Sequence, residues 1–162
     1  MHRFWIGLAL AAGAAASAAC IGGGTASPPP KVVHHTCSGL SGKHHSQVVV
    51  VHGNGTVVNA CVGFDQATMS GFSLMKNSNL ELATQPTQFG PAVCQVDREP
   101  AHYDKCLPGN APYWAAWVWN GQAWSMATTS YADVKLADHQ AIGWEYTPQT
   151  GSPAPPPQPP AS

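Results

Sequence analysis

The dipeptide Asn120-Gly121 constrains the fold of this chain more than any other feature. Asn-Gly favours a tight β-hairpin turn because both turn residues must take positive φ angles. Four of the chain's six tryptophans flank this turn: Trp114, Trp117, Trp119 and Trp124. The sequence therefore predicts an aromatic hairpin. Tryptophan is costly to leave in water, so these rings must either fill a core or line a surface that meets a ligand.

Side-chain alternation divides the hairpin into two faces, with Trp114 on one and Trp117 and Trp119 on the other. A sheet that packs on a single helix buries only one face. We therefore expect Trp114 and Trp144 to pack in the core. The predicted ligand-binding platform, for a flat ligand or a partner, consists of Trp117, Trp119, Trp124 and Tyr131. The alternative is that these rings only cover the edge of the sheet.

Residues 1–19 have the pattern of a secretory signal peptide, with a short charged start, an apolar run and then small residues. The apolar run is too short for a membrane-spanning helix. The sequence Ser17-Ala18-Ala19-Cys20 resembles a bacterial lipobox, which predicts lipidation of Cys20. Ordinary cleavage after Ala18, with free secretion, is the alternative. Residues 20–31 are rich in glycine and then proline, and we expect a flexible tether.

The C-terminal residues 148–162 are mostly Pro, Ala, Ser and Gln, so we expect an extended, disordered tail. Residues 32–147 then form a single folded domain. Charged residues make up only 9% of the chain, and the net charge is −1. This composition argues against nucleic acid as a partner and against membrane contact beyond the lipid anchor. We expect the domain to be a monomer.

Four cysteines remain once Cys20 is set aside, and an even number in an exported domain predicts two disulfides. We favour Cys94–Cys106, because this pair closes a polar, proline-containing loop. The remaining pair is Cys37–Cys61. A thiolate metal site is the alternative, but no C-x-x-C spacing supports it.

The remaining pattern predicts a small α+β fold. A hairpin is expected around His52-Gly53-Asn54-Gly55, followed by a short helix over residues 68–77. Strand-like runs cover residues 47–51, 56–62, 80–83, 92–96, 131–136 and 141–146. One helix with a small, mostly antiparallel sheet is a β-grasp-like arrangement.

Three motifs in this order resemble one family: GPAVCQVD at 90–97, YWAAWVWNG at 113–121 and IGWEY at 142–146. Residues 47–146 resemble the transcobalamin C-terminal-like domain, which is related to the soluble-ligand-binding β-grasp group. The resemblance implies a small-molecule ligand such as a corrinoid. In the vitamin carriers a helical domain completes the site, and this chain has none. His139-Gln140 stands where the family usually has Gly-Asp.

Histidines cluster near the start of the domain. Imidazoles bind zinc, copper or nickel, but this spacing matches no closed zinc site. Metal scavenging is therefore an alternative function, and no metal site is predicted. The candidate ligands are His34, His35, Cys37, His44 and His45, with His52 close by.

Catalytic motifs are weak in this chain. Residues 73–76 match S-x-x-K, but neither the S-D-N nor the K-T-G companion occurs. No G-x-S-x-G, H-E-x-x-H or phosphate-binding glycine loop is present. We expect no enzyme activity and no cofactor. The sequence predicts an exported, membrane-anchored domain that binds a small molecule. The alternative is a structural or adhesive module that docks another protein through its aromatic hairpin.

Overall fold

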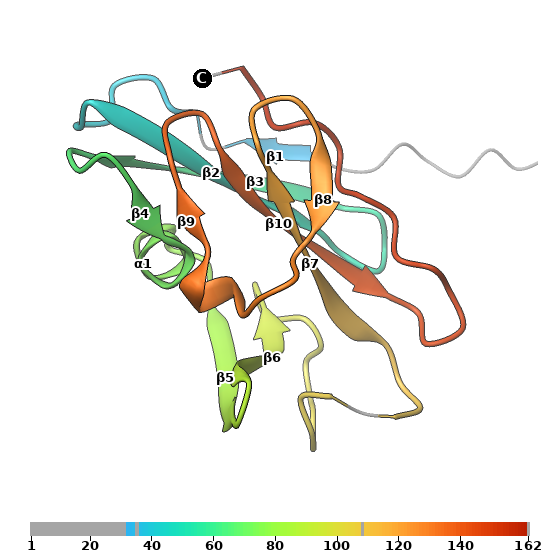
Figure 1. Cartoon of the computed structure of the whole chain (residues 1–162). Helices are drawn as coiled ribbons and strands as arrows, with labels where there is room; N and C mark the ends of the chain where they lie inside the picture. Colours follow the sequence, from blue (N-terminus) through green and yellow to red (C-terminus); the bar gives the residue numbers. More distant parts are fainter. Residues whose placement is uncertain (1–31, 35, 108, 162) are drawn as a thin grey trace, which may run out of the picture.

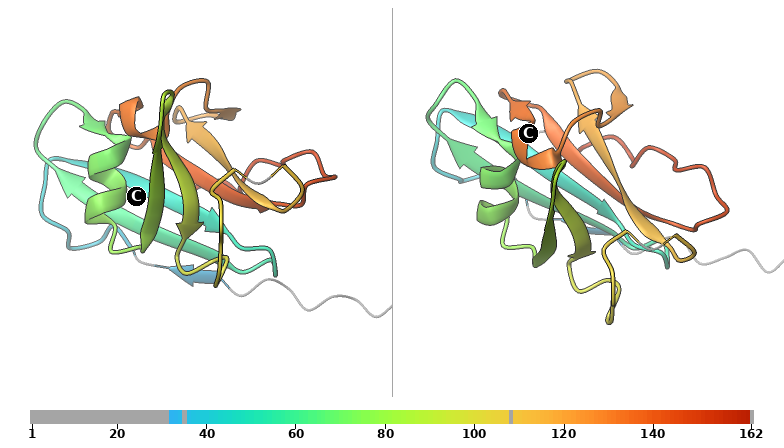
Figure 2. Two further views of the ribbon diagram at one scale, coloured as in Figure 1. Left: turned by 90° about the horizontal axis from the view of Figure 1, so that it is seen from below. Right: turned by 60° about the horizontal axis from the view of Figure 1, so that its bottom comes forward.

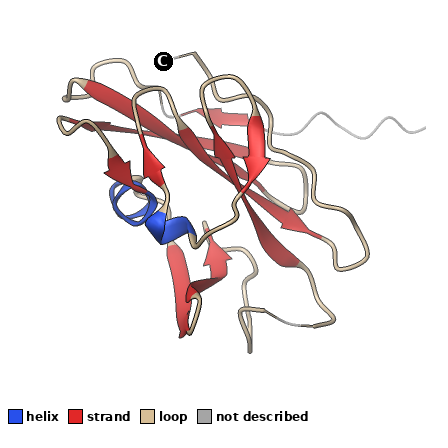
Figure 3. Cartoon of the chain, viewed as in Figure 1, coloured by secondary structure: helices blue, strands red, loops and turns tan. Residues whose placement is uncertain are grey.

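A computed structural model describes residues 32–34, 36–107 and 109–161. The predicted signal peptide, the lipidation of Cys20 and the tether fall on residues 1–31, outside the described part of the chain. The described residues form mostly β-sheet with one short α-helix, as Figure 3 shows. No helix in these ranges is long and apolar enough to cross a membrane.

The main sheet has six strands in the order β1-β3-β2-β10-β7-β8 (Figure 1). The parallel pair β2–β10 lies at its centre, and antiparallel pairs flank it on both sides. The final strand therefore lies between the first hairpin and the tryptophan hairpin. The strands are β1 (Val32–His34), β2 (His44–Val51), β3 (Val57–Phe64), β7 (Tyr113–Trp119), β8 (Trp124–Met126) and β10 (Ala141–Thr147).

The tryptophan hairpin β7–β8 is confirmed, with Trp119 paired to Trp124. The predicted two-residue turn is wrong, because residues 120–123 form a longer loop. Of the Asn-Gly pair, only Gly121 takes a left-handed backbone, with φ of 99°. Asn120 contributes its side chain instead, and its Oδ1 accepts hydrogen bonds of 2.9 Å from the backbone N–H groups of residues 122 and 123.

Helix α1 (Gly71–Asn77) is shorter than the predicted 68–77 because β4 (Met69–Ser70) occupies the preceding positions. Ser70 caps the helix by accepting a 3.1 Å hydrogen bond from the Ser73 N–H. The expected strand over 131–136 is instead the 3₁₀ turn η1 (Tyr131–Asp133) followed by β9 (Lys135–Leu136), which pairs with β4. A separate hairpin joins β5 (Leu82–Thr87) to β6 (Gly90–Val96).

The core lies between one sheet face and the layer formed by α1 and the β5–β6 hairpin, which lie on the same side of the sheet in Figure 2. Trp114 and Trp144 both belong to this core, as expected. The indole N–H of Trp144 points at the sulfur of Met75 on α1, 3.2 Å away. The aromatic residues of the hairpin are thus divided between two environments.

The second sheet face is also buried, which the sequence did not predict. Val49 and Ala141 lie on this face and are fully inaccessible to solvent. Residues 148–161, expected to be a disordered tail, run as an extended segment from the end of β10 back past β10 and β8 in Figure 1. The tail contributes no regular strand or helix, but it covers this face of the sheet.

Both predicted disulfides are present: Cys37–Cys61 and Cys94–Cys106. The first ties the segment before β2 to β3. The second ties β6 to the loop that leads into β7. Two disulfides indicate folding in an oxidising, extracytoplasmic compartment.

Candidate functional site

The face of the main sheet that points away from α1 carries the tryptophans predicted to form a platform. Trp117 and Trp119 alternate with the core-facing side of β7, and the rings of Trp119 and Trp124 lie 5.5 Å apart. The ring of Trp124 extends over Gly143 on β10, where a Cβ atom would lie 2.8 Å from its Cζ3. We call this surface, formed by Gln47, Trp117, Trp119, Trp124, Gly143 and Glu145, the tail-covered face.

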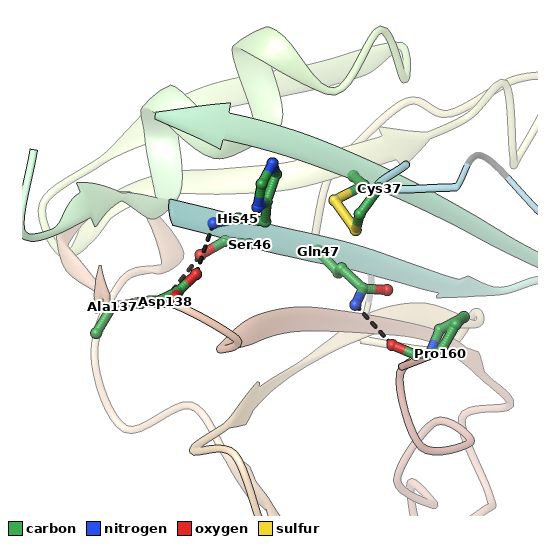
Figure 4. Close-up of a disulfide and its surroundings, with 8 residues drawn as sticks. Cys37, His45, Ser46, Gln47, Ala137, Asp138 and Pro160 are labelled. Atoms are coloured by element: carbon green, nitrogen blue, oxygen red, sulfur yellow. Dashed lines mark hydrogen bonds between the residues drawn. A yellow bond between two sulfur atoms is a disulfide. The ribbon is translucent and has the colours of Figure 1, made fainter. Parts of the chain in front are cut away.

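Three hydrogen bonds attach the tail to this face at intervals of three residues. The backbone N–H of Ala154 donates to Glu145 Oε2 over 2.6 Å. The indole N–H of Trp124 donates to the Pro157 carbonyl over 3.2 Å. The Gln47 amide donates to the Pro160 carbonyl over 2.8 Å, as Figure 4 shows.

Pro156 lies between these hydrogen bonds and is buried. Its ring is close enough to Gly143 that a Cβ there would lie 2.7 Å from the proline Cγ. Gly143 is therefore the point where both a tryptophan ring and a proline ring meet the bare backbone of the sheet.

The structure brings together three of the four predicted platform residues. Trp117 and Trp124 are half-buried and Trp119 is buried, all on the tail-covered face. Tyr131 lies apart from them in the core, where its ring is 5.4 Å from that of Trp144. Burial raises the pKa of Tyr131 above its usual value. A strand was expected at Tyr131. The residue instead begins the 3₁₀ turn η1, which contacts α1, and its side chain therefore packs in the core.

Sequence reasoning missed Gln47 and Gly143 as parts of this surface. The glycine had a readable signal, because a glycine within an aromatic strand often marks a close approach by another group. Gln47 had none. Its burial, with 5% of its surface exposed, depends on the register that places it opposite Ala141 and Cys61.

A separate cavity of about 470 Å³ lies at the end of the domain that carries the Cys94–Cys106 disulfide. It is lined by aromatic rings and by a few charged or polar groups. The loop before β7 supplies the charged and polar groups. The residues that give it its chemical character are Tyr103, Tyr113, Trp114, Tyr146, His102 and Lys105. Tyr103 is the most accessible of the aromatic groups, with 40% of its surface exposed.

Polar contacts fix the inner wall of this cavity. The Trp114 indole N–H donates to the Glu99 carbonyl over 3.0 Å. The Glu99 carboxylate lies 2.8 Å from His52 Nδ1, and Asp97 lies 3.2 Å from His52 Nε2. Burial, and then the charge of Glu99, raise the pKa of Tyr146 above its usual 10.0. The Trp114 ring is thus held by the turn that follows β6, which the β2–β3 turn contacts through His52.

One histidine ring of the predicted metal-scavenging segment, that of His44, meets a carboxylate, which also meets His139 from outside that segment. Asp138 Oδ2 lies 3.6 Å from His44 Nδ1 and 3.2 Å from His139 Nε2. The backbone N–H of His45 lowers the pKa of Asp138 below its usual 3.8, and the two imidazoles add to the effect. Within the described ranges, no group of three His, Cys, Asp or Glu residues is placed to hold a metal ion. His35 lies outside these ranges.

Comparison with known proteins adds no assignment to this geometry. No family model matches the sequence, and no curated protein matches it.

Proposed function

We propose that this chain is an exported, non-catalytic binding domain that takes a small molecule into the cavity beside the Cys94–Cys106 disulfide. The observation that carries the proposal is the cavity itself. Its volume of about 470 Å³ is in the range of small-molecule sites, and its wall combines several aromatic rings with a few polar groups. The predicted platform is occupied by the tail, whereas this cavity is open at the surface.

The chemistry of the wall suits a flat ligand with a polar edge. The rings of Tyr103 and Tyr113 offer faces for stacking, while Lys105 and His102 supply hydrogen-bond donors. Asp104 adds an acceptor on the same wall. A corrinoid is the ligand that the family resemblance implies, and it has both a flat ring and polar amide arms.

The strand order supports a β-grasp-like assignment and thus the resemblance to the transcobalamin C-terminal-like domain. In this proposal the central parallel pair β2–β10 and the flanking hairpins form the β-grasp sheet. Cys20, once lipidated, would tether the domain to the outer side of a membrane through residues 20–31. The tether would leave the cavity accessible to ligands in the extracytoplasmic space.

Calorimetric titration of the purified chain with cobalamin and with cobinamide tests the proposal. We expect saturable heat, and we expect Tyr103→Ala to bind about tenfold more weakly because one stacked ring contributes ~1.4 kcal/mol. Phe89→Ala is the matched control, since Phe89 is exposed between β5 and β6 and does not line the cavity. If neither corrinoid gives heat on titration, corrinoids are excluded as ligands of this cavity. An equal loss in both variants would remove the cavity as the site.

A further inference from the structure

The spacing of the three tail contacts is the starting point. The tail residues that bond to the sheet are Ala154, Pro157 and Pro160. A polyproline II helix has about three residues per turn, so these positions lie along one of its edges. The face that they meet is lined by tryptophan rings, as are many surfaces that recognise proline-rich segments. The spacing therefore matches a polyproline II ligand on an aromatic receptor.

The receptor side of this contact is formed by residues of β2 and β10. Gln47 is buried, and its amide reaches the Pro160 carbonyl at 2.8 Å. A side chain at position 143 would meet the ring of Pro156, and Gly143 leaves that space open. Glu145, held also by the Thr147 hydroxyl at 3.2 Å, accepts from the tail backbone. Rigid strands supply each of these groups.

The tail itself is held at a shallow depth. Pro156 is buried, whereas Pro155, Pro157 and Gln158 are exposed. The buried indole N–H of Trp117 has no hydrogen-bond partner among the described residues. A buried donor left without an acceptor carries a free-energy cost, so this face is not optimally satisfied. A segment with few buried groups is held weakly and is poised to exchange.

We propose that the tail-covered face is a receptor for an uncharged proline-rich segment of a partner protein, and that the chain's own tail is an exchangeable ligand of this receptor. The chemistry of the partner follows from the occupant. Residues 148–162 carry no charged side chain, and the prolines at 156, 157 and 160 give the pattern P-P-x-x-P. The tail thereby controls access to the surface. This inference is independent of the ligand cavity and stands or falls separately.

The test uses the full chain with a site-specific protease sequence inserted between Gly151 and Ser152. The protein folds intact and is then cut and dialysed. The probe is a fluorescein-labelled peptide of residues 152–160, and anisotropy reports its binding. We expect saturable binding to the cut protein and at least tenfold weaker binding to the uncut protein, because a tethered tail competes at a high effective concentration.

Three further measurements show whether the binding is specific. A peptide with alanine at positions 156, 157 and 160 should not bind. Trp124→Phe keeps an aromatic ring but removes the indole N–H and part of the ring surface, and it should weaken binding about five- to tenfold. Phe89→Ala should leave binding unchanged.

Full-length Pro156→Ala provides a route that needs no cutting, since a loosened tail should raise peptide binding above that of the uncut wild type. Absence of peptide binding to both the cut protein and this variant overturns the proposal. Equal binding of the alanine peptide overturns it as well. A wild-type chain that sediments as a dimer with exchanged tails would make a second copy the occupant, and the partner proposal would be wrong.

Discussion

The ring of Trp124 lies so close to the backbone of Gly143 that a Cβ atom at position 143 would be 2.8 Å from Cζ3 and 2.9 Å from Cη2. These two residues sit on strands separated by β7, and they meet because Trp124 reaches across its neighbour. The contact places Trp124 where its N–H can bond Pro157. One glycine thus determines how the aromatic hairpin and the tail fit together.

Gly143→Ala should therefore loosen both the Trp124 ring and the tail. The new methyl group would displace Trp124 or Pro156, and such overpacking costs about 1–3 kcal/mol of stability. We expect a lower denaturation midpoint and greater quenching of tryptophan fluorescence by acrylamide. Gly109→Ala is the control, because a Cβ there meets nothing within 4 Å. Unchanged quenching in Gly143→Ala would contradict the close packing of these rings.

Helix α1 offers a matched pair for testing the core. Leu74 is fully buried against the sheet, whereas Phe72 on the same helix is 53% exposed. Leu74→Ala should destabilise the domain by about 2–5 kcal/mol, because it removes buried methyl groups and leaves a cavity. Phe72→Ala should change stability by less than about 0.5 kcal/mol. Urea denaturation of both variants checks the difference, and similar costs would contradict the assigned orientation of the helix.

Local signals in the sequence were sufficient for much of the fold. The β-branched run of β2, the short helix near residues 68–77 and both disulfides follow from residue types and short spacings. Tyr131 was misplaced because its role depends on the distant partner Trp144, which alternation along one strand does not reveal. The conformation of the turn at residue 139 was likewise not readable from residue types. His139 takes φ of 60°, the conformation for which glycine is favoured.

The tail was the largest gap between sequence and structure. Its composition predicts disorder because proline-rich segments bury little of their own surface. Composition describes this segment in isolation, but the sheet face beside it supplies rings and buried polar groups that no local pattern in residues 148–162 records. Gln47 and Pro160 are 113 residues apart in sequence. The candidate surface was thus predicted in part, through its tryptophans, and its occupant was not.

Loss of either disulfide should lower the free energy of unfolding, and the two losses should differ in size. Cys37–Cys61 spans 24 residues of sequence and Cys94–Cys106 spans 12. Loop-closure entropy predicts that each bond contributes about 2–4 kcal/mol, with the larger value for the longer loop. Thermal denaturation of Cys37→Ser/Cys61→Ser and Cys94→Ser/Cys106→Ser measures both.

The Cys94→Ser/Cys106→Ser variant should also weaken ligand binding in the cavity, since both cysteines line it. A ligand affinity unaffected by that change would separate the cavity from its disulfide.

Asp138 predicts a defined dependence of stability on pH. The His45 backbone N–H, 2.7 Å from Oδ1, lowers the pKa of this carboxyl below its usual 3.8. A group with a lowered folded-state pKa stabilises the fold above its unfolded pKa, and this stabilisation is lost as the pH falls through the folded value. Asp138→Asn removes the charge but keeps an acceptor. At pH 7 we expect it to be less stable than the wild type by less than about 1 kcal/mol, because the side chain is 34% exposed.

The difference between Asp138→Asn and the wild type should shrink as the pH falls below 3.8 and should vanish once Asp138 is protonated in the folded state. Urea denaturation at pH 7, 4 and about 2.5 measures this convergence. Asp133→Asn is a suitable control, because Asp133 is exposed in η1 and belongs to none of the ion pairs between described residues. If the difference in unfolding free energy is the same at all three pH values, the substitution acts through packing of the β9–β10 turn. The charge of Asp138 would then not hold the β2 histidines in place.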